Sequence, residues 1–103
     1  MFDIFDFFNT DVLAMMGTYE QRKVDNFKCD EFVVDTSEVY DRSQPYETAV
    51  LYEGFNRNEW IILEFSDTRE EAQKVHNKWV EYFKNNNVTE IKDAYSDIVF
   101  IKG

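Results

Sequence analysis

Residues 46–65 read YETAVLYEGFNRNEWIILEF, and they contain the clearest strand pattern in the chain. Aromatic and β-branched residues dominate residues 46–53 and 60–65, which is typical of β-strands. Residues 54–58, between them, contain one glycine and two asparagines, which favour tight turns. The sequence therefore predicts a β-hairpin with two antiparallel strands.

A long helix is predicted directly after this hairpin, over residues 67–86. Thr68 and Glu71 fit a capping box at its start, because each can bond the backbone of the other. The asparagines at 85–87 favour its end, since Asn tolerates left-handed backbone. An apolar stripe recurs at helical spacing. It consists of Ala72, Val75, His76, Trp79, Val80 and Phe83.

Three further regions have strand character. Residues 31–36 predict a strand, with residues 20–28 as its candidate hairpin partner. Residues 94–102 predict a final strand centred on residues 97–101. The expected fold class is therefore α+β, with a mostly antiparallel sheet of three to five strands, one long helix on one face and a short Phe-rich N-terminal helical segment.

A chain of 103 residues is expected to form one domain, residues 1–103. Within it, residues 1–17 form the N-terminal helical segment or arm, and residues 18–66 form strands. The helix and the final strand follow.

The Phe-rich segment has two interpretations. Residues 60–63 and similar runs place apolar side chains on both faces of the sheet, but one helix covers only one face. Either residues 1–17 fold back over the second face, or they form an arm that docks on a partner. Both interpretations remain open at this point.

The charge balance limits the class of partner. Twenty-one acidic residues against eleven basic ones give a net charge of −10, which disfavours direct contact with nucleic acid or anionic membranes. No stretch reaches the roughly 18 apolar residues of a membrane-spanning helix. Asp3 and Asp6, without an early Lys or Arg, do not fit a signal peptide.

The sequence contains few residues that fit a catalytic site. His76 is the only histidine, and an acid–base pair with Glu47 or Glu64 is the enzymatic interpretation. A hydrogen-bonded histidine at the edge of the core is the favoured alternative. One His and the single Cys29 do not make a zinc site. We therefore expect a non-enzymatic protein without catalytic, cofactor or metal sites.

Aromatic residues mixed with charges around the hairpin are typical of protein interfaces. Trp60 is expected to pack internally, and Phe55, at the tip of the turn, to contact a partner. Residues 30–67 carry ten acids and two bases, and such carboxylates can imitate a phosphate backbone. The candidate partner-binding residues are Phe2, Phe5, Phe8, Tyr46, Tyr52, Phe55, Glu47, Glu53, Glu59 and Glu64.

A longer pattern covers residues 18–82. It comprises Thr18-Tyr19-Glu20, Arg22-Lys23-Val24, Pro45 and Tyr46-Glu47-Thr48-Ala49-Val50, then Trp60, Glu64, Glu70-Glu71-Ala72, His76 and Trp79-Val80. This pattern resembles small uncharacterised proteins of tailed phages, a family with no known activity. The resemblance implies a phage or prophage origin, and a location in the host cytoplasm or the virion.

Three functions are consistent with these features. The first is a virion or assembly component that binds a phage structural protein or a second copy of itself. The second is an acidic inhibitor of a basic host nucleic-acid-binding or defence protein, acting by imitation of DNA. The third is a small enzyme that uses His76. The first is favoured, because the apolar N-terminus accounts for more of the unusual sequence than charge does.

Overall fold

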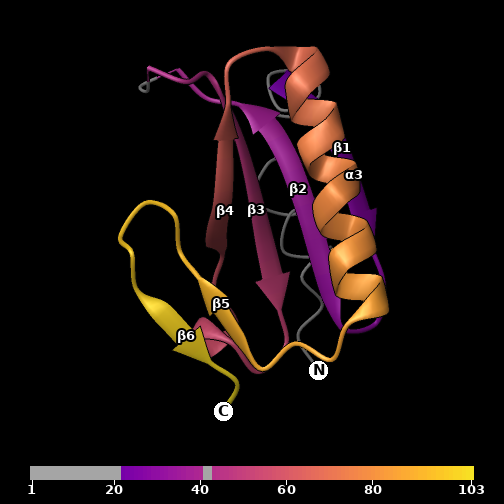
Figure 1. Cartoon of the computed structure of the whole chain (residues 1–103), viewed down its shortest axis with the longest axis vertical. Helices are drawn as coiled ribbons and strands as arrows, with labels where there is room; N and C mark the ends of the chain where they lie inside the picture. The colour runs from indigo at the N-terminus through magenta and orange to yellow at the C-terminus, as the bar shows by residue number, and fades with distance from the viewer. Residues whose placement is uncertain (1–21, 41–42) are drawn as a thin grey trace, which may run out of the picture.

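The computed structural model describes residues 22–40 and 43–103. Four strands form one antiparallel sheet in the order β1-β2-β3-β4, and one helix, α3, covers one face of it (Figure 1). These elements are β1 (Lys23–Lys28), β2 (Phe32–Glu38), β3 (Tyr46–Tyr52), β4 (Ile61–Ser66) and α3 (Arg69–Asn85). The predicted α+β class is confirmed. Phe2, Phe5 and Phe8 lie outside the described residues.

The turn between β3 and β4 curls back into the core. Gly54 has a φ of 90°, and three consecutive residues with positive φ form the short 3₁₀ turn η2 (Asn56–Asn58). Glycine and asparagine tolerate this left-handed backbone better than other residues. Phe55 is fully buried by the curl, and its ring lies 5.2 Å from that of Tyr52. The expectation that Phe55 contacts a partner is therefore wrong.

Helix α3 begins and faces the sheet as predicted. The Thr68 side chain caps it by accepting a hydrogen bond from Glu71 N at 3.1 Å, and Glu71 Oε1 accepts one from Asp67 N. Of the predicted stripe, Trp79 is half-buried and the other members are buried. The buried members are Ala72, Val75, His76, Val80 and Phe83.

The core forms between α3 and the sheet. Phe83 of the helix packs its ring 5.4 Å from Phe32 and 5.5 Å from Tyr52. Aromatic pairs at these separations add to the stability that burial itself provides. Trp79 stacks on Phe83 at 5.6 Å, so the aromatic cluster continues toward the exposed side of the helix.

The strands are also buried on the face turned away from α3. Val33, Ala49 and Leu51 alternate with the core-facing residues of β2 and β3, and all three are buried. Burial on both faces agrees with the apolar pattern of these strands. The two interpretations of residues 1–17 fall outside the described part of the chain.

The end of the chain differs from the prediction. Strands β5 (Glu90–Lys92) and β6 (Val99–Ile101) form a separate two-stranded antiparallel sheet beyond β4 (Figure 1). The predicted strand at 94–102 is shorter than expected and does not join the main sheet. Residues 94–96 instead form a turn, in which the backbone amides of Tyr95 and Ser96 bond to the Asp93 carboxylate and that of Ala94 bonds to Ile62 O.

Candidate functional site

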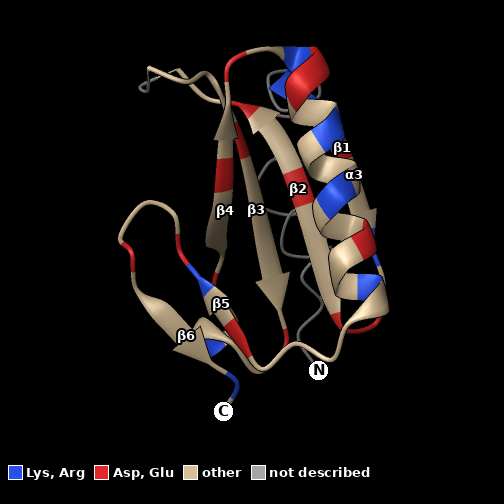
Figure 2. Ribbon diagram, in the orientation of Figure 1, with Lys and Arg blue, Asp and Glu red and all other residues tan. Residues whose placement is uncertain are grey.

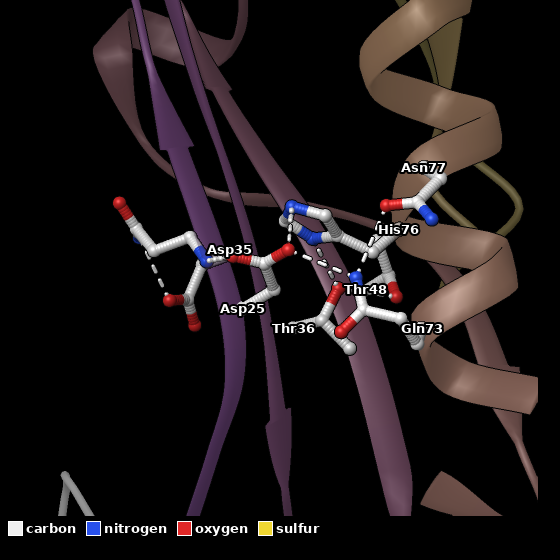
Figure 3. Close-up of polar contacts among 8 residues, drawn as sticks. Asp25, Asp35, Thr36, Thr48, Gln73, His76 and Asn77 are labelled. Carbon is white, nitrogen blue, oxygen red and sulfur yellow. Dashed lines mark hydrogen bonds and ion pairs between the residues drawn. The ribbon is translucent and has the colours of Figure 1, made fainter. Parts of the chain in front are cut away.

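The first candidate is a chain of polar side chains between α3 and the sheet, buried at Thr36, Thr48 and His76 and half-buried at Asp25 and Gln73 (Figure 3). Thr48 Oγ1 lies 2.8 Å from Thr36 Oγ1, which lies 2.9 Å from His76 Nδ1. On the other side, His76 Nε2 is 3.6 Å from Asp25 Oδ2, and Gln73 Nε2 donates to the same oxygen at 2.8 Å. We call these five residues the His76 network. It joins strands β1, β2 and β3 to the helix.

The protonation states in the His76 network follow from its surroundings. Burial lowers the pKa of His76, and the nearby carboxylates Asp25 and Asp35 offset this only in part. Burial alone would raise the pKa of Asp25, but hydrogen bonds from Gln73 and from Asn26 N, together with nearby positive charge, lower it overall. The favoured state at neutral pH is therefore a neutral imidazole beside an ionised carboxylate.

A hydroxyl, an imidazole and a carboxylate in sequence are the parts of a nucleophilic centre. Here, however, Thr36 is 0% exposed and His76 2% exposed, so a substrate has no access to the hydroxyl. The distance of 3.6 Å is also too long for a hydrogen bond between His76 and Asp25. The arrangement agrees with the favoured expectation of a hydrogen-bonded histidine within the core.

The carboxylate beside His76 is not one that the sequence analysis named. Glu64 accepts hydrogen bonds from Lys78 and Trp79 of α3 instead. Glu47 precedes Thr48, whose side chain faces the helix, so Glu47 points to the opposite face. Asp25 was missed because a bulge between Lys23 and Asp25 shifts the register of β1, which periodicity alone does not reveal.

The other predicted contact residues do not gather on one surface. Tyr52 is buried, Tyr46 is half-buried, and Glu53 and Glu59 are exposed. Strands β2, β3 and β4 carry acidic but no basic residues, whereas α3 carries both (Figure 2). Since Glu47 and Glu64 lie on opposite faces of the sheet, the strand carboxylates do not form one continuous row.

The second candidate is a surface groove of about 760 Å³ between α3 and the β5–β6 hairpin. Leu63 and Ile91 line it together with Trp79, Tyr82 and Val99. Lys78, Lys92, Glu90 and Asp97 add charge of both signs to its lining. An apolar centre with mixed charges around it is the composition of a protein-binding surface.

The β5–β6 hairpin is held against β4 by one carboxylate. Asp93 Oδ1 accepts from Tyr95 N at 2.8 Å and from Ser96 N at 2.9 Å, while its Oδ2 accepts from Ile62 N at 3.2 Å. Burial raises the pKa of Asp93, but these backbone hydrogen bonds lower it overall. Ala94 N also donates to Ile62 O at 2.8 Å, so the turn is fixed to the edge of β4.

Exposed apolar side chains are concentrated on this hairpin. Of the six large hydrophobic side chains exposed in residues 22–40 and 43–103, four belong to it. They are Tyr95 at 64%, Ile98 at 52%, Val99 at 48% and Ile101 at 64%, and we call them the hairpin surface. This surface was not predicted, because residues 94–102 were expected to form the final strand of the sheet. The sequence feature that could have indicated the hairpin is Asp93 followed by the polar turn residues Tyr95-Ser96-Asp97, which separate two short strands.

Within the described part of the chain, no three His, Cys, Asp or Glu side chains are grouped so as to hold a metal ion. The helices of that part are too short or too polar to cross a membrane. Comparison with family models, curated proteins and solved structures finds no match to this chain.

Proposed function

We propose that this chain is a non-enzymatic protein-interaction module whose contact area is the hairpin surface together with the adjoining groove. The observation that carries this proposal is the concentration of exposed apolar residues on one short hairpin. Clustered apolar exposure beside a concave surface marks interaction sites, whereas isolated exposed apolar residues are ordinary.

Two features of the structure support this assignment. Trp79 and Tyr82 place large aromatic rings 5.5 Å apart at the helix side of the groove, and aromatic residues dominate binding energy at interfaces. The hairpin opposite them is tied down by Asp93 and by the bond from Gly103 N to Gly54 O. A contact surface held in place loses little conformational entropy on binding.

The sequence resemblance adds a biological setting to the proposal. A phage-encoded module of this kind would serve as a virion or assembly component. A virion or assembly component acts by binding another protein, and an apolar contact surface suits this role better than an open polar pocket does.

The experiment is a selection of binding peptides from a random displayed library on the immobilised full chain. We expect selected peptides to bind a Tyr82→Ser/Val99→Ser double variant at least about tenfold more weakly than the unmodified chain. Tyr40→Ser is the matched control, because Tyr40 is exposed but does not line the groove, so the change should leave binding unchanged. Equal binding to all three chains would show that the groove is not the contact area.

The second candidate function is the acidic inhibitor. It is favoured by the exposed Asp30, Glu31 and Glu53, which lie at one end of the sheet where Glu53 N donates to Glu31 O at 3.0 Å. Binding to a basic partner there would weaken steeply with salt. Binding through the apolar groove would persist at high salt, so a salt titration separates the two functions.

A further inference from the structure

The outer edge of β6 offers unpaired backbone groups. Asp93 N donates to Ile98 O at 2.8 Å and Lys102 N donates to Thr89 O at 3.1 Å, so Ile98 and Lys102 turn their backbone groups toward β5. Backbone groups alternate in direction along an antiparallel strand, so Phe100, which pairs with Ile91, also turns its N–H and C=O toward β5. Val99 and Ile101 therefore direct their N–H and C=O groups outward, and no described strand pairs with them.

Both edges of the four-stranded sheet are protected. Strand β1 is interrupted by its bulge at Lys23/Asp25 and carries charged residues, both of which discourage pairing. On strand β4, both backbone groups of Ile62 are already used: its C=O accepts from Ala94 N, and its N–H donates to the Asp93 carboxylate. By contrast, β6 has no bulge and no charged residue, and it presents Val99 and Ile101 to solvent. The bond from Gly103 N to Gly54 O lies beyond the strand and leaves Val99 and Ile101 accessible. An apolar edge of this kind is a template for pairing with another chain.

We propose that β6 pairs antiparallel with β6 of a second copy of this chain, about a two-fold axis at Phe100. The two β5–β6 hairpins then form one continuous sheet. This inference rests on the proposed function, because it uses the hairpin surface as the contact area and names the partner. A two-fold interface requires that one surface be complementary to itself.

The edge meets this requirement in its hydrogen bonds. With Phe100 opposite Phe100 of the second copy, Val99 lies opposite Ile101 of the second copy. Both residues of this pair turn their backbone groups outward, so each donates to and accepts from the other. If the pairing of the two β6 strands shifted by one residue, backbone groups that point toward the second copy would lie opposite groups that point toward β5, and these hydrogen bonds would be lost.

The side chains agree with the same register. Val99 and Ile101 are β-branched, and cross-strand pairs of such residues stabilise sheets. Lys102 lies opposite Ile98 of the second copy, and Asp97 lies opposite Gly103, so no side chains of like charge are directly opposed. Val99 also lines the groove, so Ile101 of the second copy extends its apolar wall.

Analytical ultracentrifugation of the full chain over a range of concentrations tests the proposal. An edge of three residues makes a small interface, so we expect a dimer that dissociates on dilution. Ile101→Pro removes one outward N–H without touching the bonds to β5, and we expect it to be monomeric at every concentration. Tyr40→Ser should dimerise like the unmodified chain. Ile101→Lys, which adds charge to the edge, replaces the proline variant if that chain does not fold.

Disulfide trapping tests the register. In a Cys29→Ser background, Val99→Cys is mixed with Ile101→Cys under oxidising conditions. In a hydrogen-bonded antiparallel pair, such as residue 99 with residue 101 of the second copy, the Cα atoms lie about 5.5 Å apart, within reach of a disulfide. The two copies of residue 99 are offset by roughly two residues along the strands, as are the two copies of residue 101, so neither of these pairs is within reach. We expect the mixed disulfide dimer to exceed the share that random pairing of the two variants gives. A mixed share at the random value would overturn the proposed register.

The outcomes separate the two proposals. A monomeric unmodified chain, or an Ile101→Pro variant that still dimerises, would overturn pairing through β6. If such a chain still binds groove-dependent peptides, the proposed function stands and only the identity of the partner is wrong. If peptide binding also ignores the groove variant, both proposals fail.

Discussion

His76 shows how a polar residue can be part of a hydrophobic core. Its Nδ1 has a hydroxyl partner in Thr36, and that hydroxyl is shared with Thr48. A buried polar group costs stability only when it lacks a partner, and this chain of hydrogen bonds supplies partners from strands β2 and β3. The same burial makes the imidazole a poor proton acceptor.

The lowered pKa of His76 predicts a pH dependence of stability. Because the folded-state pKa lies below the ordinary value of 6.5, the unfolded chain binds this proton more readily. The stabilisation is present above pH 6.5 and is lost as the pH falls toward the folded-state pKa. We expect urea unfolding to give a smaller free energy of unfolding at about pH 5.5 than at about pH 7.5.

His76→Gln is the control for this prediction. Glutamine can still bond to Thr36 but does not titrate, so this variant should lose most of the difference between the two pH values. An unchanged pH dependence in the variant would assign the effect to other groups.

At the scale of elements, the β5–β6 hairpin depends on Asp93 for its position. This one carboxylate bonds the turn at Tyr95 and Ser96 and reaches across to Ile62. Hydrogen bonds to a charged acceptor are stronger than neutral ones, and each donor that loses its partner costs free energy.

Replacing Asp93 by alanine should therefore release the hairpin from β4. We expect the free energy of unfolding to fall by about 1–3 kcal/mol. The amide of Ile62 should exchange hydrogen faster, as measured by NMR, because its acceptor is removed. Glu90→Ala, an exposed change on β5, should alter stability by less than about 0.5 kcal/mol. Unaltered exchange at Ile62 in the Asp93 variant would contradict this role.

The elements were predicted with unequal success. The β3–β4 hairpin and α3 were predicted well because long runs, a turn with Gly54, and the Thr68 cap all agree with one another. Strand β5 was missed because three residues with one apolar side chain give almost no periodic signal.

At the scale of the whole molecule, the net charge of −10 opposes both compaction and self-association. Raising sodium chloride from about 0.05 M to about 0.5 M screens this repulsion. We therefore expect the midpoint of thermal unfolding to rise with salt, and the dimer formed through β6 to strengthen. The measurements are thermal denaturation and ultracentrifugation at both salt concentrations.

A dimer that weakens with salt would contradict pairing through an apolar edge. It would indicate an interface held together by opposite charges instead.

The α+β class, the central hairpin, the extent of α3 and its buried stripe could all be predicted from the sequence. These depend on local periodicity, capping and turn chemistry, which act between residues close in the chain. The sequence did not reveal that Asp25 lies beside His76, that Phe55 is buried, or that the last strands form a separate exposed hairpin. Each of these features requires a contact between elements: β1 with α3, the turn with the core, and Asp93 with Ile62 of β4. Local periodicity carries no information about such contacts, which form only when distant parts of the chain pack together.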